Sequence, residues 1–503
     1  MPALPEQRGP APNPRRWQSL VAISGLVALV WILADGFVVA VPTITKEIGG
    51  SIDQMAWAVN GYSIAICMAA FFGRLGDVRG NRRLIIAGSA ILIVGSVLGG
   101  LAQSPTELIA ARVLQGIGGT AIFTCALSAI TIQFPLSERA RAISLKSAMG
   151  YAAGGLAIVI VAGVLELLGW RAVFWVVIPV ALVGLGLVVF TTPETHDRRT
   201  GSRLDLAGAL ALTTAFVVAS YALIESDEIG LARFLLIAGI SAVLFASFAF
   251  IENRATDPLI PLSVWRRPTF TASILVNFAF NGLMVGLLYL LALYLQTARG
   301  LSSIDAAVVL LGATVTLILA NPAGARLAGR GRYALPVLVG LPLMAVGCIG
   351  VLLGVKADSN AIIMLGLVVF GAAVGVQVAS VSTLQVSSAG ATKGTASGVV
   401  GVMIGASNAI GIALATAIME NSAVRSLRET TGSSSLEGIS HSRLIDILTG
   451  SLPVDSVSPA GQKVVIDALD SGIVTASAIF AALALVVLVL AAVLLREVQL
   501  DAD

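Results

Sequence analysis

Fourteen apolar runs, each long enough to cross a bilayer, constrain the fold of this chain of 503 residues more than any other feature. A membrane-spanning helix needs about 20 apolar residues. The runs cover residues 17–41, 54–73, 82–102, 105–133, 143–168, 171–192, 205–225, 232–252, 270–295, 304–325, 334–355, 361–384, 396–420 and 472–495. Backbone amides in hydrocarbon need partners within their own segment, and the alternation typical of a β-barrel is absent. The sequence therefore predicts an all-α polytopic membrane protein with 14 transmembrane helices.

The distribution of positive charge predicts how these helices are oriented. Residues 1–16 form a basic, Pro-rich tail, and about two thirds of the 31 Lys and Arg residues lie on the tail's side of the membrane. That side is expected to be cytoplasmic by the positive-inside rule. An even number of spans returns the chain to its starting side. We therefore expect a multi-pass protein of the cell inner membrane with both termini in the cytoplasm. The first run is too long for a cleaved signal peptide and should remain as a span.

Two polar loops indicate an internal duplication. The loop at 73–83 reads GRLGDVRGNRR, and the loop at 325–332 reads ARLAGRGR, a weaker copy. If they are equivalent, the first six spans correspond to the last six. The predicted divisions are a cytoplasmic tail (1–16), an N-terminal six-helix bundle (17–200), a two-helix insertion (201–256) and a C-terminal six-helix bundle (257–503) with an extracytoplasmic loop at about 421–471. Duplicated bundles are a common basis of alternating access.

The first of these loops has the composition of a conformational latch. Gly73 and Gly80 lack a Cβ, so the loop can approach neighbouring helix ends closely. Asp77 can bind helix N-termini or an arginine. We interpret these three residues, with Arg82 and Arg83, as a latch at the cytoplasmic side. The alternative is a generic positive-inside loop, which explains the arginines but neither the glycines nor the acid.

Away from the ends of the predicted spans, only Asp35 and Arg112 carry charge. Each lies seven residues inward from a proline, Pro42 or Pro105, which is about 10 Å at 1.5 Å per residue. A buried charge in a membrane is costly, so both should face a cavity or each other. A carboxylate whose surroundings change can bind and release a proton. We predict that Asp35 carries the proton and Arg112 modulates it. The alternative is a static ion pair that fixes helix packing.

Polar and aromatic side chains within the runs are candidate substrate contacts, although such residues more often form interhelical hydrogen bonds. Asn277 and Asn281 are favoured because they share one face of the span equivalent to that of Asp35. The full set is Trp31, Asn60, Tyr62, Gln115, Asn277, Asn281, Tyr289, Asn321 and Gln377, with Asn408 as a further residue. A largely apolar cavity suits hydrophobic or amphipathic, mainly cationic, solutes and lipid-like molecules, and it suits sugars poorly.

Several classes of protein are disfavoured by what the chain carries. Cys67, Cys125 and Cys348 fall in apolar runs, and His196 and His441 lie far apart, so neither a disulfide framework nor a metal site is predicted. No lysine follows a glycine in a phosphate-binding loop, which excludes an ATP-driven pump. We expect no cofactor and no nucleic-acid partner, and a monomer whose partners are its solute, protons and membrane lipids. A membrane enzyme with a site assembled only in three dimensions stays as an alternative.

The chain resembles the major facilitator superfamily and, within it, the fourteen-span drug/proton antiporters. The loop at 73–83 fits the family's G-x-L-x-D-x-x-G-x-R-R pattern at every defined position, and residues 112–119 (RVLQGIGG) are similar to its R-x-x-Q-G-x-G pattern. This resemblance implies the major facilitator fold: two six-helix bundles plus, in this branch, two inserted helices. It also implies that the latch closes the cytoplasmic side in the outward-open state, with Asp77 and Arg83 as charge partners.

The resemblance extends to activity. Gly150, Gly154 and Gly155 resemble the glycine-rich motif of the antiporters' fifth span, without its proline, and Gly116 belongs to the fourth-span pattern. We expect these four as helix-packing glycines. Members of the family carry an acidic residue in the first span at the position where this chain has Leu33, two residues before Asp35. The resemblance implies proton-coupled export of drug-like compounds, with a lipid or amphipathic-metabolite exporter of the same fold as the alternative.

Overall fold

The structure is a computed structural model that describes residues 13–194, 205–255, 265–330, 332–388, 393–430 and 459–500. Within these ranges all regular secondary structure is helical. In this part of the chain twelve helices are long and apolar enough to cross a membrane, and the number is thirteen if the pair Asp53–Ile66 and Ala69–Arg79, bent by 42°, is counted as one span. A shorter apolar stretch, Ala152–Leu168, lies where the remaining span is predicted. The prediction of an all-α multi-pass membrane protein is confirmed.

The N-terminal half begins with α1 (Arg16–Gly36), which continues through the 3-10 turn η1 (Phe37–Ala40) into α2 (Val41–Ile48). The remaining helices of this half are α3 (Ile52–Ile66), α4 (Ala69–Arg79), α5 (Asn81–Leu101), α6 (Pro105–Gln133), α7 (Leu136–Leu168), α8 (Trp170–Trp175) and α9 (Val177–Thr191). Local sequence sets their ends. Ser104 caps α6 just before Pro105, and Gly169, at a φ of 81°, ends α7.

The inserted pair consists of α10 (Leu206–Ile224) and α11 (Ser226–Arg254), and the predicted boundaries at 201 and 256 lie outside the described residues. The C-terminal half comprises α12 (Pro268–Thr297), α13 (Ser303–Gly329), α14 (Ala334–Lys356), α15 (Asn360–Ser388), α16 (Lys393–Thr430) and α18 (Pro459–Leu500). The last two helices extend into the loop predicted at 421–471, so residues 421–430 and 459–471 are helical rather than part of a loop. Residues 431–458 lie outside the described part.

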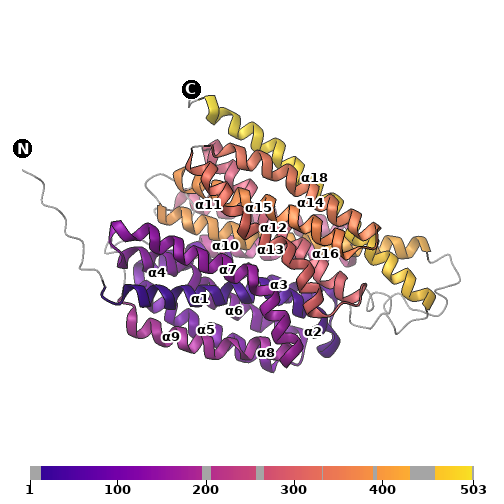
Figure 1. Cartoon of the computed structure of the whole chain (residues 1–503), viewed down its shortest axis with the longest axis horizontal. Helices are drawn as coiled ribbons and strands as arrows, with labels where there is room; N and C mark the ends of the chain where they lie inside the picture. Colours follow the sequence, from indigo (N-terminus) through magenta and orange to yellow (C-terminus); the bar gives the residue numbers. More distant parts are fainter. Residues whose placement is uncertain are drawn as a thin grey trace, which may run out of the picture.

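The two halves repeat one packing pattern. In the first half α1 packs on α7 and α9, α3 on α6, and α5 on α6 and α9. In the second half α12 packs on α16 and α18, α13 on α15, and α14 on α15 and α18. These pairs match if α1, α3, α5, α6, α7 and α9 correspond in order to α12, α13, α14, α15, α16 and α18. The pattern supports the predicted duplication, and α1 begins at the same end of the molecule at which α18 ends (Figure 1).

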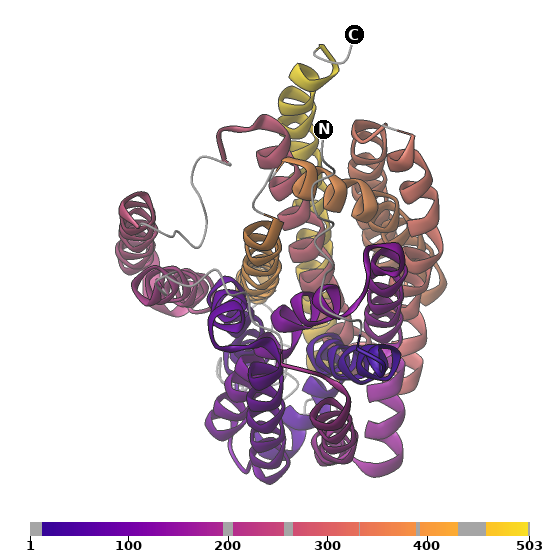
Figure 2. The same cartoon turned by 90° about the vertical axis from the view of Figure 1, so that its left-hand side faces the viewer.

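The halves meet along two seams that the same correspondence relates to each other. One seam is formed by α7 against α13 and the other by α3 against α16. The inserted helix α10 packs on α16 and α3 and so lies over the second seam, with α11 outside it (Figure 2). Trp57 on α3 donates from Nε1 to Glu225 at the end of α10 (3.4 Å). The insertion therefore contacts both halves on one side of the molecule.

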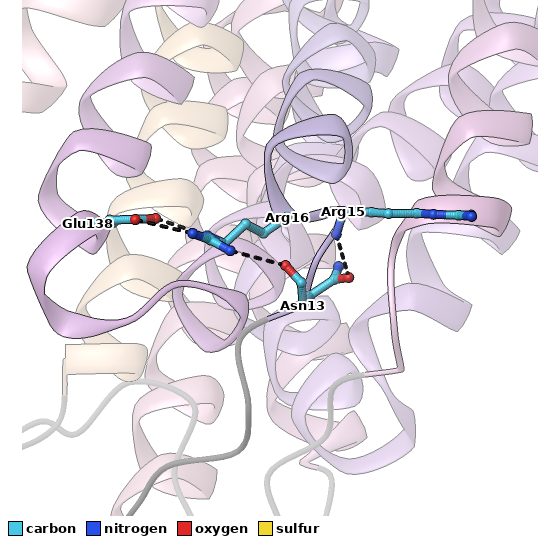
Figure 3. Close-up of polar contacts among 4 residues, drawn as sticks. All are labelled: Asn13, Arg15, Arg16 and Glu138. Carbon is cyan, nitrogen blue, oxygen red and sulfur yellow. Dashed lines mark hydrogen bonds and ion pairs between the residues drawn. The ribbon is translucent and has the colours of Figure 1, made fainter.

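The two ends of the bundle differ in charge. The basic end, defined by Arg16, Arg82 and Arg83, is tied together around the start of α1: Arg16 donates from Nε (2.9 Å) and Nη2 (3.2 Å) to Glu138 on α7 (Figure 3). Asn13 donates to Gln133 of α6 (2.9 Å). These contacts fix the start of α1 against α6 and α7.

The closed end, opposite the basic end, joins the halves through a continuous apolar core. Residues 37–41 of the first half and 287–295 of the second belong to the same buried cluster. Gln296 donates from Nε2 to the carbonyl oxygen of Val39 (3.1 Å). Glu166, near the end of α7, accepts from the backbone amide of Ile304 (3.1 Å). Apolar burial and hydrogen bonds thus hold the halves together at this end.

Candidate functional site

A cavity of about 380 Å³ lies between the halves. Its wall is built by α1, η1, α6 and α7 from the first half and by α12, α13, α15 and α16 from the second. Most lining side chains are apolar. The charged and amide- or hydroxyl-bearing side chains are Asp35, Lys146, Asn277, Asn281, Thr314, Ser382, Gln385 and Asn408. A mainly apolar site with a few polar groups is typical of binding sites for drug-sized molecules.

Asp35 lines this cavity near its closed end. The carboxylate lies against α7, where a methyl group added at Gly154 would be 3.0 Å from Oδ2 of Asp35. One helical turn earlier on α1, the Trp31 ring meets Phe123 edge-on at 5.5 Å. Among the residues that the structure describes, no cation lies within ion-pair distance of Asp35. The acid therefore faces the cavity without a counterion.

Arg112 does not pair with Asp35, so the predicted acid–guanidinium couple is not formed. Its guanidinium is fully buried and donates to the backbone carbonyls of Leu33 (3.1 Å) and Ala58 (3.3 Å) and to Oε1 of Gln115 (3.0 Å). It also lies over two aromatic rings, Phe37 at 4.1 Å and Tyr62 at 4.5 Å. These contacts join α1, η1, α3 and α6. Arg112 therefore holds these four elements of the first half together.

The turn of α1 explains why the couple is missing. Two residues rotate a helix by about 200°, so the sides of α1 that carry residues 33 and 35 are nearly opposite. The backbone of Leu33 contacts Arg112, and Leu33 itself is buried, whereas Asp35 lines the cavity. Equal depth in the membrane, which the two prolines predict, does not determine the direction in which a side chain points.

Lys146 is a charged cavity residue that the sequence did not reveal. It was placed near the start of a span predicted at 143–168, where a lysine would reach the membrane surface. Instead α7 begins at Leu136, ten residues earlier, and Lys146 lines the cavity. Its ammonium nitrogen lies 5.1 Å from the centre of the Phe123 ring. A helical wheel of 136–168 would have placed Lys146 on the face of Gly150 and Gly154.

Three of the nine predicted substrate contacts line the cavity. These are Trp31, Asn277 and Asn281, and Asn408 lines it as well. Asn281 donates to the Oδ1 of Asn277 (3.0 Å), so the two amides act as one polar unit on α12. The predicted shared face is correct. Phe123, Thr314, Ser382 and Gln385 were missed because nothing in a single sequence separates them from ordinary core residues.

The other six candidates lie outside the cavity lining: Asn60, Tyr62, Gln115, Tyr289, Asn321 and Gln377. Several of them hold helices together, which was the alternative interpretation. The Tyr62 hydroxyl donates to the Val30 carbonyl of α1 (2.9 Å). Gln115 donates to Ser96 of α5 (2.9 Å). For Tyr62 and Gln115 the structure therefore shows a packing role rather than a place in the cavity wall.

Comparison with known proteins identifies the family. The family model described as the Major Facilitator Superfamily matches residues 20–412. The chain belongs to the major facilitator superfamily. This is the family that the loop at 73–83 predicted.

Curated relatives of this major facilitator protein include exporters and resistance proteins. It is 30% identical over 355 residues to the tetracenomycin C resistance and export protein of Streptomyces glaucescens, an overlap of 69% of this chain and 65% of that one. It is 28% identical over 420 residues to the multidrug resistance protein Stp of Mycobacterium tuberculosis, covering 80% and 76%. It is 32% identical over 414 residues to the probable actinorhodin transporter of Streptomyces coelicolor, covering 78% and 70%.

Solved structures share the fold at lower identity. A bacterial homologue of the human lysosomal transporter Spinster, in an inward-facing and unoccupied conformation, matches with a TM-score of 0.66 at 17% identity, covering 96% of this chain and 97% of that one. An auto-inhibited POT family peptide transporter matches with a TM-score of 0.64 at 15% identity, covering 95% and 97%. These matches establish the major facilitator fold.

The signature segment 73–83 was predicted to be a loop, but in the structure its residues belong to α4 and α5 except for Gly80, which separates the two helices at the basic end. Gly80 has a φ of 105°, and a methyl group there would overlap the carboxylate of Glu194, just after α9. Arg82 donates to the Val189 carbonyl of α9 (2.7 Å). Arg83 pairs with Glu194 (3.4 Å) rather than with its predicted partner, Asp77. In this conformation the two arginines therefore bind the end of α9.

The glycines of the major facilitator motifs differ in how closely they are packed. A methyl group at Gly116 would lie 2.6 Å from the Tyr62 carbonyl oxygen, so this glycine brings α6 against α3. A methyl group at Gly155 would overlap Ile318 of α13, at the seam between the halves. Gly154 leaves space for Asp35, and Gly150 has only ordinary contact with Trp31. Three of the four predicted glycines therefore occupy positions with little room for a side chain.

Proposed function

We propose that this protein is a proton-coupled exporter of hydrophobic and amphipathic compounds that works by alternating access. The proposal is supported by a cavity between two halves of matching architecture and by relatives named as export and resistance proteins. The chain matches 65% of the length of the tetracenomycin relative. The export activity in that relative's name therefore supports the proposal and is not carried over to this chain as a fact. Membership of a transporter family favours this function over the enzyme alternative.

The observation that carries the proposal is Asp35 in the cavity wall without a counterion. A charged carboxylate in a membrane interior costs several kcal/mol, and binding a proton removes that charge. Water that reaches the carboxylate when the cavity opens favours the charged form and release of the proton. One acid can thus be loaded in one conformation and discharged in the other, which couples the proton to the movement of the halves.

The present conformation is proposed to face the cytoplasm. The halves are joined at the closed end through Gln296 and Val39, while the cavity lining reaches Gln385, three residues before the end of α15 at the basic end. The positive-inside rule makes the basic end cytoplasmic. We also propose that Asp77, Gly80, Arg82 and Arg83 form a latch, and that the contacts of the two arginines at the end of α9 change during the cycle. Gly73, with open space at its Cβ, is left out of this latch.

The test is transport into inverted membrane vesicles with an imposed pH gradient. Wild type is expected to accumulate a fluorescent lipophilic dye when the interior is acidic, and Asp35→Asn is expected to lose gradient-driven accumulation. The matched control is Asp305→Asn, because Asp305 lies in the first turn of α13 at the membrane surface, away from the cavity. Equal accumulation by wild type and Asp35→Asn would refute the coupling role of Asp35. Absence of transport by wild type would refute export itself.

A further inference from the structure

Lys146 places a positive charge inside the proposed transport cavity. It lies ten residues after the start of α7 at the basic end, about 15 Å along the helix at 1.5 Å per residue. Its ammonium group is over the Phe123 ring, and the described part of the chain supplies no carboxylate within ion-pair distance of it. A desolvated ammonium without an acid attracts an anion. Lys146 is the one cation among the described residues that line the cavity.

Two glycines connect this charge to the opposite end of the cavity. Gly150 and Gly154 follow Lys146 at successive helical turns, and all three line the cavity. Because these glycines have no side chains, Trp31 and Asp35 of α1 can lie close to this face of α7, and the cavity runs along it. Asp35 lies against Gly154, eight residues from Lys146, so the two charges are separated by about 12 Å along the helix.

An aromatic surface borders the same groove. Trp31 lies beside Gly150, with 3.6 Å between its ring and a methyl group built there, and it contacts Phe123 edge-on. Phe123 in turn lies under the Lys146 ammonium. A flat ring in the groove would therefore contact Trp31 and Phe123 while an acidic substituent reaches Lys146. The amide pair Asn277 and Asn281 faces the same cavity from the other half.

We propose that Lys146 binds the acidic group of the exported solute, and that the cavity therefore selects elongated aromatic acids over cations of the same shape. The proposal rests on the proposed export function and names its substrate class. An aromatic acid about 10–12 Å long fills the groove along α7, with its acidic group at Lys146 and its other end near Asp35. Of the two charged residues that line the cavity, Lys146 lies nearer the basic end and Asp35 nearer the closed end.

The experiment measures equilibrium binding of three probes to the full-length protein in nanodiscs, with empty nanodiscs as the blank. The probes are biphenyl-4-carboxylate, the neutral biphenyl-4-carboxamide and the cationic biphenyl-4-trimethylammonium. Wild type is expected to bind the carboxylate most tightly. Lys146→Met should weaken carboxylate binding about 10- to 100-fold, the effect of losing a charge-assisted hydrogen bond. Binding of the carboxamide should change by less than about 3-fold.

Two further variants make the result specific. Lys146→Arg keeps the charge and should restore carboxylate affinity to within about 5-fold of wild type. Lys356→Met removes an exposed lysine at the end of α14 and should leave all three affinities unchanged. Gel filtration of each variant shows that it is folded. The expected order of affinities, with loss in Lys146→Met and recovery in Lys146→Arg, would support the assignment.

Three outcomes would overturn it: unchanged carboxylate affinity in Lys146→Met, tighter binding of the cation than of the carboxylate by wild type, or a wild-type dissociation constant for the carboxylate above about 1 mM. The vesicle assay separates these failures from failure of the proposed function. If gradient-driven dye transport persists while any of the three occurs, export stands and the acid preference is wrong. If Lys146-dependent binding is found without transport, the binding site stands and export is wrong.

Discussion

The seam between α3 and α16 offers a sharp test of the alternating-access arrangement, because its closest contact involves only backbone atoms. Gly405 of α16 lies so near α3 that an added methyl group would be 2.8 Å from both the carbonyl oxygen of Ser63 and the amide nitrogen of Cys67. Neither atom can move without moving its helix. Gly405→Ala should therefore separate the two helices rather than displace a side chain.

The size of this effect follows from the contact. Overpacking by one methyl group in a well-packed interior costs about 1–3 kcal/mol. If the strain exists only while this seam is closed, the equilibrium between conformations shifts by the same free energy, a factor of about 5 to 150. Cys67, which is free and buried at the seam, reports the shift. In a background with Cys125→Ala and Cys348→Ala, its labelling by N-ethylmaleimide should speed up by about that factor.

Gly155→Ala is the matched control at the other seam. A methyl group at Gly155 meets the end of the Ile318 side chain, which can rotate away, with the nearest backbone oxygen, that of Thr314, 3.7 Å distant. Labelling of Cys67 in this variant should stay within about 5-fold of the parent, since a rotamer change costs about 1 kcal/mol or less. If Gly405→Ala leaves the labelling rate unchanged, or if both variants raise it equally, the reasoning from backbone contact is refuted.

Two further predictions concern the basic end. Gly80→Ala should slow dye transport several-fold, because its φ of 105° and the nearby carboxylate of Glu194 both disfavour a side chain at this position. Gly73→Ala is the control, because the space around its Cβ is open, and it should transport at the wild-type rate. Equal rates in both variants would contradict the latch. The hydrogen bond from Arg16, with the charges of Arg16 and Arg141, holds the pKa of Glu138 below its ordinary value. The stability that this pair adds is complete above the ordinary glutamate pKa of about 4.3 and is lost as the pH falls through the lowered pKa. The difference in melting temperature between wild type and Glu138→Gln, followed by fluorescence in detergent, should therefore be constant near neutral pH and disappear in acid; a difference that grows in acid would contradict it.

The course of the chain through the membrane could be predicted because it depends on composition over long windows. Hydrocarbon requires helices of a minimum length, so each apolar run fixes a helix whatever its neighbours are. Helix ends were less accurate. α7 begins at Leu136 and α16 extends to Thr430 because helices continue into water beyond the apolar run, where hydropathy no longer marks them.

The site was predicted only where side chains repeat with the helical period. Asn277 and Asn281 share a face because they are four residues apart, and that inference needs no partner helix. The pairing of Asp35 with Arg112 required the rotation of α1 relative to α6, which a single sequence does not contain. Lys146 was missed because it stands near the start of the span predicted at 143–168, and a single sequence does not show that this part of the helix faces a cavity.

The inserted helices make the two sides of the molecule unequal. The seams α3–α16 and α7–α13 are equivalent by the internal repeat, yet α10 lies over only the first. Beside the second, the lipid-facing side chains of Leu156 and Leu319 are exposed. A compound dissolved in the bilayer thus meets α10 and α11 at the α3–α16 seam, whereas at the α7–α13 seam it meets the two helices of the seam themselves. For such a compound, α10 and α11 cover one of the two interfaces between the halves and leave the other accessible from the lipid.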